Sequence, residues 1–183
     1  MTRSALIRSG IAVFVLVGAA LLVPLPFGGR ASTALGDLVH APLFGILVFL
    51  TLWGWQRLSA QGANADQIDM NWRSLVLRAA FVGTGLALFG IAMEFAQMQS
   101  GRSGSKHDAV ANTLGSIVGT LVYFATLARK TKRRVVPGCL LAFAFGVWCF
   151  AWSGPIGLLA DVVRMPNEFP MLASFESNAE LTR

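Results

Sequence analysis

Five long apolar runs, separated by shorter polar segments, make up most of this chain. They extend over about Leu6–Phe27, Leu38–Gln56, Leu75–Gln97, Ala109–Ala128 and Val136–Leu159. A helix needs about 20 mainly apolar residues to cross a hydrocarbon core of about 30 Å. The pattern therefore predicts an all-α fold, a polytopic transmembrane helical bundle with about five spans.

The first run has two interpretations. Arg3 and Arg8 precede it and Pro24 and Pro26 end it, so a basic segment followed by an apolar core also matches a secretory signal peptide. The run is long for a signal peptide, and it lacks a clear small-x-small cleavage site. We therefore interpret it as a span, and both interpretations place Arg30 outside the cell.

Composition supports the membrane interpretation. The chain is 55% hydrophobic and 13% charged, with a mean hydropathy of +0.61, whereas a soluble domain is about a quarter charged. A net charge of +6 would suggest a nucleic-acid partner in a soluble protein. Here the basic residues lie between apolar runs, so we expect a lipid bilayer as the partner and no nucleic acid.

The distribution of Lys and Arg predicts the orientation. Alternating the spans places ten of these residues with the N-terminus and five on the other side, and the first group includes the basic run Arg129–Arg134. Cytoplasmic loops carry the excess of Lys and Arg. We therefore expect the N-terminus inside and the C-terminus outside, with the basic run also in contact with anionic headgroups.

Polar residues that are costly in hydrocarbon gather at the predicted outer ends of three spans. They form three pairs spaced three or four residues apart, so that each pair shares one helix face. The connecting loop adds hydroxyls and cations at the same level, including Lys106. We expect an outer polar pocket whose candidate ligand-binding residues are Asp37, His40, Glu94, Gln97, Arg102, Ser105, Asp108 and Asn112.

Each of these residues also has a structural interpretation. Asp108 could cap the fourth helix, and His40 could be a hydrogen-bonded residue between helices. Glu94 is harder to explain structurally, and its expected partners are Arg102, Lys106 or His40. Cys139 and Cys149 are too far apart along one helix to form a disulfide, and we interpret both as small buried hydrophobic residues.

A stripe of small residues predicts close helix packing beside this pocket. Ala111, Gly115 and Gly119 recur every four residues along the fourth run. Small residues at this spacing let helix backbones approach closely in membranes. The stripe lies on nearly the same face as Asp108 and Asn112.

At these residues the chain resembles the VanZ-like family. Gly36–His40 before an apolar run resembles its first signature, and the stretch from Glu94 to Gly119 resembles its second: E-x-x-Q, then G-R, then S-x-x-D-x-x-x-N-x-x-G-x-x-x-G. The resemblance covers roughly residues 10–130. One departure is Leu38, where the family commonly has a lysine.

The resemblance implies a multi-pass protein of the cell membrane, the bacterial inner membrane, in a family associated with low-level teicoplanin resistance and without an established biochemical activity. It divides the chain into a VanZ-like membrane domain (1–135), a fifth transmembrane helix (136–160) and an extracytoplasmic tail (161–183). The tail resembles the opening strand of a β-sandwich module that follows some VanZ-like domains.

Three functions can be compared with this pattern. In the first, the outer pocket of an envelope protein binds a lipid headgroup, a cell-wall precursor or a glycopeptide-related ligand, and no cofactor or resident metal is expected. In the second, a membrane enzyme acts on a lipid-linked envelope substrate by acid/base chemistry, or through a divalent metal held by His40 and carboxylates. Transport is disfavoured because the chain has no internal repeat and its polar residues lie away from the bilayer midplane.

Overall fold

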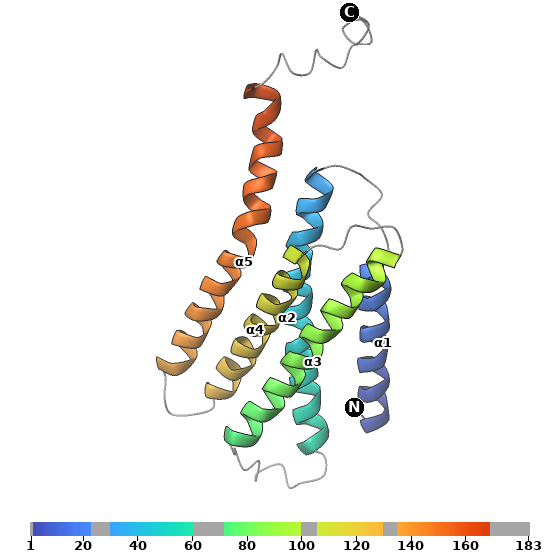
Figure 1. Cartoon of the computed structure of the whole chain (residues 1–183). Helices are drawn as coiled ribbons and strands as arrows, with labels where there is room; N and C mark the ends of the chain where they lie inside the picture. Colours follow the sequence, from blue (N-terminus) through green and yellow to red (C-terminus); the bar gives the residue numbers. More distant parts are fainter. Residues whose placement is uncertain (1, 23–29, 61–71, 100–105, 130–134, 169–183) are drawn as a thin grey trace, which may run out of the picture.

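The protein is an all-helical bundle, as the pattern predicts (Figure 1). A computed structural model describes residues 2–22, 30–60, 72–99, 106–129 and 135–168. These residues form α1 (Arg3–Leu22), α2 (Arg30–Ala60), α3 (Trp72–Gln99), α4 (Lys106–Ala128) and α5 (Val135–Glu168). Four helices are long and apolar enough to cross a membrane, over Ala34–Ser59, Trp72–Gln99, His107–Ala128 and Val135–Arg164, so this is a multi-pass membrane protein.

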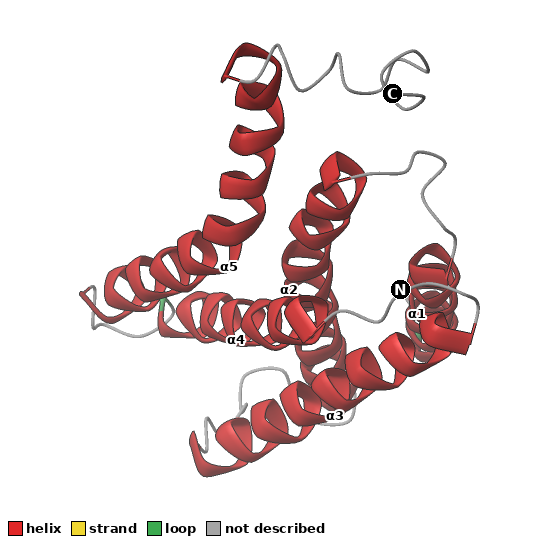
Figure 2. Ribbon diagram, turned by 45° about the horizontal axis from the view of Figure 1, so that its top comes forward, coloured by secondary structure: helices red, strands yellow, loops and turns green. Residues whose placement is uncertain are grey.

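The bundle is built around the α2–α4 pair, whose contact is the most extensive one (Figure 2). α3 packs against α2 and α4, α1 against α2 and α3, and α5 against α4 and α2. The apolar core includes Phe44, Leu47 and Val48 of α2 and Leu86 of α3, all buried, with Phe14 of α1 packed against it. Large apolar side chains on the outer helix faces are exposed, as expected for residues that meet lipid tails.

Four small residues allow the close approach of α2 and α4. A Cβ atom at Gly115 would overlap the carbonyl oxygen of Ala41, and one at Gly119 would overlap that of Gly45. The backbones therefore touch along a seam made by two residues of each helix, spaced four apart. Ala111, one turn earlier on α4, is also buried.

Pro42 lies inside α2, where it has no N–H to donate to the carbonyl of Leu38. That carbonyl accepts a hydrogen bond from Trp152 Nε1 of α5 at 3.2 Å. A donor from a neighbouring helix thus occupies the acceptor that the proline leaves free. α5 thus contributes a bond that α2 cannot make for itself.

The helices extend beyond the apolar runs. α2 begins at Arg30 rather than near Leu38, so Asp37 and His40 lie inside the helix and do not open it. α5 continues to Glu168, so residues 161–168 of the expected tail are helical, and the rest of the tail lies outside the described residues. Hydropathy marks the apolar core, whereas a helix can continue into the headgroup layer.

The interpretation of Cys139 and Cys149 as buried residues was wrong. Both thiols are exposed on α5. α5 contacts the bundle along only one side, with α4 and α2, and most of its side chains are left on the outer surface. An apolar thiol is as compatible with a lipid-facing surface as with a core, so the sequence did not distinguish the two.

Candidate functional site

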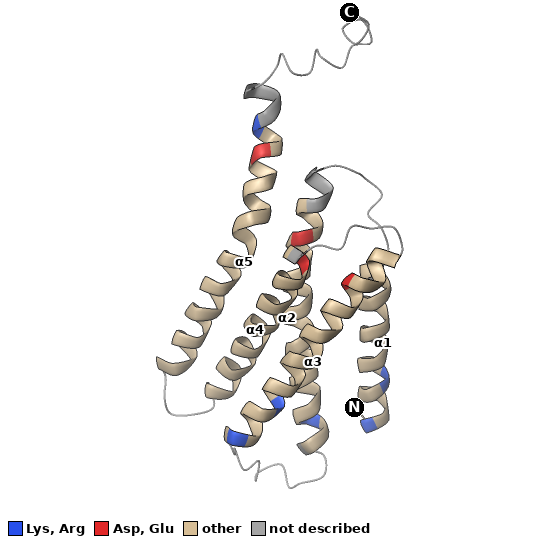
Figure 3. Ribbon diagram, viewed as in Figure 1, with Lys and Arg blue, Asp and Glu red and all other residues tan. Residues whose placement is uncertain are grey.

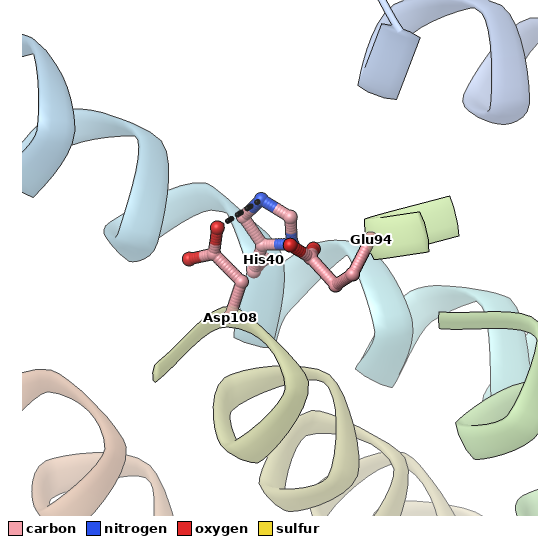
Figure 4. Close-up of side chains that lie close together, drawn as sticks. All are labelled: His40, Glu94 and Asp108. Atoms are coloured by element: carbon pink, nitrogen blue, oxygen red, sulfur yellow. Dashed lines mark ion pairs between the residues drawn. The ribbon is translucent and has the colours of Figure 1, made fainter. Parts of the chain in front are cut away.

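Three ionisable side chains from three helices meet near one end of the bundle. His40 of α2, Glu94 of α3 and Asp108 of α4 are only 5%, 7% and 6% exposed. Each offers one nitrogen or oxygen atom, and these atoms lie within 4.8 Å of one another. Figure 4 shows the imidazole of His40 between the two carboxylates. We call these residues the three-helix cluster.

A hydrogen bond from α4 fixes the state of the His40 ring. His40 Nδ1 lies 2.9 Å from Asn112 Oδ1. A carboxamide oxygen only accepts hydrogen bonds, so Nδ1 carries the hydrogen and donates it. The other ring nitrogen, Nε2, lies 3.8 Å from Asp108 Oδ2, the pair joined by the dashed line in Figure 4. Nε2 is therefore the atom that His40 presents to Asp108.

A glycine on α3 leaves room for the side chain of Asn112. It lies one turn after Asp108 on α4 and is 1% exposed. A Cβ atom at Gly90, one turn before Glu94, would lie 2.9 Å from Asn112 Nδ2 and 3.0 Å from the Phe44 ring. Gly90 thus leaves the space that the carboxamide occupies. Asn112 Nδ2 has no hydrogen-bond partner among the residues that the structure describes.

Gln97 has a different position from the one its sequence pairing suggested. It is buried, and its Nε2 donates a hydrogen bond to the Leu21 carbonyl at 2.9 Å. Leu21 is in the last turn of α1, where carbonyls have no partner within the helix. This bond of Gln97 therefore joins α3 to the end of α1.

The remaining predicted site residues are not in the cluster. Asp37 is partly exposed on α2, one turn before His40, and is not one of the three clustered groups. Arg102 and Ser105 lie outside the described residues, as does the side chain of Lys106. Asp108 is in the first turn of α4, two residues after its start, where a negative charge suits the helix dipole. It is not the residue that precedes the helix.

Basic and acidic residues of α1, α2, α3 and α4 with described side chains lie toward opposite ends of these helices (Figure 3). Five arginines of α1, α2 and α3 have described side chains, and they lie at one end of the bundle. They are Arg3, Arg8, Arg57, Arg73 and Arg78. The acidic residues of α2, α3 and α4 lie toward the other end. The positive-inside rule predicts that the arginine end faces the cytoplasm and the cluster the outside.

Sequence reasoning missed Gly90, Ala41, Gly45 and Trp152. Signals for three of them exist: Ala41 and Gly45 are small residues four apart, as on α4, and Gly90 lies four residues before Glu94. No comparable signal marks Trp152. The pairing of these residues across helices depends on the packed structure.

The cluster can do two things chemically. An imidazole and two carboxylates can transfer protons to and from a bound molecule, or together hold a cation. Asn112 holds the imidazole in one tautomer for either purpose. A comparison with known protein families, curated proteins and solved structures finds no match to this chain.

Proposed function

We propose that this protein is a VanZ-like envelope protein of the bacterial inner membrane, and that its outer polar pocket binds the polar headgroup of a membrane-embedded ligand. The ligand class is a lipid headgroup, a lipid-linked cell-wall precursor or a related glycopeptide-type molecule. The observation that carries the proposal is the convergence of His40, Glu94 and Asp108, with Asn112, from three helices at the end opposite the described arginines of α1, α2 and α3.

The location of the cluster favours a ligand that enters from the membrane. Buried ionisable residues in membrane helices are costly and are usually associated with substrate or ion pathways. The cluster is near one end of the bundle, so in a protein whose helices span the bilayer it would be closer to the headgroup layer than to the midplane. Hydroxyls, amides and phosphate oxygens of such a headgroup would pair with carboxylates, the Asn112 amide and the loop cations Arg102 and Lys106.

The binding test uses thermal unfolding of the purified protein in detergent. Short-chain lipids with phosphocholine, phosphoglycerol and diphosphate headgroups are added in turn, together with a soluble cell-wall precursor. A ligand at 100 times its Kd stabilises the folded state by about 2.7 kcal/mol. We expect one class to raise the unfolding midpoint, and Glu94→Ala and Arg102→Ala to remove that increase.

Asp161→Asn is the matched control, because Asp161 is an exposed carboxylate near the same end, on α5. It should keep the full ligand effect. Teicoplanin susceptibility of cells that express the protein or Glu94→Ala gives a second measurement. The proposal fails if no headgroup class protects the protein and Glu94→Ala cells behave as the unmutated ones do.

A second function, acid/base catalysis on a lipid-linked substrate, is favoured by one observation. Asn112 fixes one nitrogen of His40 while the other faces Asp108, an arrangement that leaves Nε2 to accept or return a proton. Mass spectrometry of lipid-linked precursors incubated with the protein tests it. Turnover that is lost in His40→Gln supports catalysis, and unchanged precursors support binding alone.

A further inference from the structure

The three-helix cluster brings two carboxylates and one imidazole together at a buried position. Glu94 and Asp108 are almost fully removed from water, and ionised carboxylates at such positions are unfavourable unless a positive charge accompanies them. Their proximity adds mutual repulsion. A neutral imidazole contributes a lone pair but no charge.

The geometry of His40 suits a metal ligand. In the neutral imidazole whose Nδ1–H is bonded to Asn112, Nε2 carries the lone pair, and this atom lies toward Asp108. The Nε2–Oδ2 distance of 3.8 Å is too long for a hydrogen bond. Two ligands bound to one ion at about 2.1 Å lie about 3.0–3.5 Å apart. The ligand atoms lie within 4.8 Å of one another, so a contraction of up to about 1.3–1.8 Å in the widest pair would bring the cluster to that spacing.

We propose that His40 Nε2, Glu94 and Asp108 bind one divalent metal ion, with Asn112 as the residue that positions the imidazole. A divalent ion offsets both carboxylate charges, whereas one proton on His40 offsets only one. Metal-bound histidines almost always donate their other N–H to a neighbouring acceptor, as His40 does to Asn112.

The ligand set selects the class of ion. Carboxylates suit Mg²⁺, Ca²⁺ and Mn²⁺, and imidazole suits Zn²⁺ and the other later first-row ions. A mixed set therefore favours an ion of the Mn²⁺ to Zn²⁺ series, with Zn²⁺ bound more tightly than Mn²⁺. Three protein ligands leave coordination positions open for an oxygen ligand. If the proposed headgroup binding holds, on which this last step rests, a phosphate oxygen would bind there.

The test is metal titration of the purified full-length protein, free of any affinity tag, in lipid nanodiscs. Cys139→Ala and Cys149→Ala form the background, since both thiols are exposed and would bind Zn²⁺ themselves. We expect one Zn²⁺ or Mn²⁺ per chain. Asn112→Ala should weaken binding about 10–100-fold, and the isosteric changes Glu94→Gln and Asp108→Asn should weaken it more. Asp161→Asn should leave it unchanged.

Pulsed EPR of the Mn²⁺-loaded protein adds a readout of the ligand itself. We expect a coupling to histidine ¹⁴N that disappears in His40→Gln. Circular dichroism checks the fold of each variant, and Asn112→Ala keeps the test valid if a ligand variant does not fold. A rival arrangement, with protons on His40 and Glu94 or a charge from Arg102, predicts no bound metal.

The two proposals fail in different ways. Absence of stoichiometric metal, or equal affinity in the unmutated protein, Glu94→Gln and Asp108→Asn, overturns the metal site. Headgroup protection that persists in the metal-free protein leaves the ligand-binding proposal in place. Metal binding without protection by any headgroup lipid supports the metal site and contradicts the ligand-binding proposal.

Discussion

His40 Nδ1 and Asn112 Oδ1 are 2.9 Å apart, and both side chains are buried between α2 and α4. The bond joins two helices and also fixes the tautomer of the ring. Measured interhelical hydrogen bonds in membranes average about 0.6 kcal/mol, with a maximum of about 1.7 kcal/mol. The value of this bond to the site is therefore mainly orientation of the ring, with a small contribution to stability.

A double-mutant cycle measures that contribution. We expect His40→Ala and Asn112→Ala to show a coupling of about 0.6 kcal/mol in the free energy of unfolding, in detergent with a chelator present. The control cycle pairs His40→Ala with Tyr123→Phe, since Tyr123 bonds Gln56 farther along the bundle. That pair should be additive. Additivity of His40→Ala with Asn112→Ala would show that the bond contributes nothing.

At the scale of whole helices, the seam between α2 and α4 determines how close the site residues come. Gly115 and Gly119 meet the backbone of Ala41 and Gly45. His40 immediately precedes Ala41, and Asn112 lies three residues before Gly115 on α4. Close backbone contact therefore places the two side chains within hydrogen-bond distance.

We expect Gly119→Ala to lower the free energy of unfolding by about 1–3 kcal/mol, because the added Cβ overlaps the Gly45 carbonyl and forces the helices apart. This cost exceeds the gain of about 0.5–1 kcal/mol from replacing a helical glycine with alanine. Gly85→Ala is the control, since its Cβ would meet nothing within 4 Å. Equal stability of the two variants would contradict the proposed role of the seam.

The sequence was sufficient to predict the helices but not their partners. Apolar runs of the right length located every helix, because hydrophobic length follows the thickness of the bilayer. They did not mark the ends of α2 and α5, which continue past the apolar residues. The spacing of Glu94 and Gln97 placed both on one helix face, but the α1 carbonyl that Gln97 bonds is 76 residues away. Such contacts depend on the packing of helices.

The same limit applies to the site. Charge counting and spacing grouped six polar residues at one end, and three ionisable groups do meet there. Asp37 and His40 share a helix face by spacing, yet only His40 is in the cluster. A small rotation of α2 decides which of the two points into the bundle, and that rotation is set by the seam.

For the molecule as a whole, the separation of charge predicts the orientation. Ser4→Cys and Asp161→Cys, each made in the Cys139→Ala, Cys149→Ala background, place one thiol at each end on exposed positions. We expect a membrane-impermeant maleimide to label Asp161→Cys in intact cells and Ser4→Cys only after lysis. The reverse labelling would place the three-helix cluster on the cytoplasmic side and would exclude an extracytoplasmic ligand.

The bond between Trp152 and the Leu38 carbonyl bears on where this protein can be divided. The expected division of the chain at residue 135 makes α5 look like a separable addition. Yet a chain that ended before Val135 would lack Trp152, the donor for the carbonyl that Pro42 leaves free. That carbonyl is less than one helical turn from His40. A division of the chain between α4 and α5 therefore separates this carbonyl from its donor, and α2 depends on α5 for the bond.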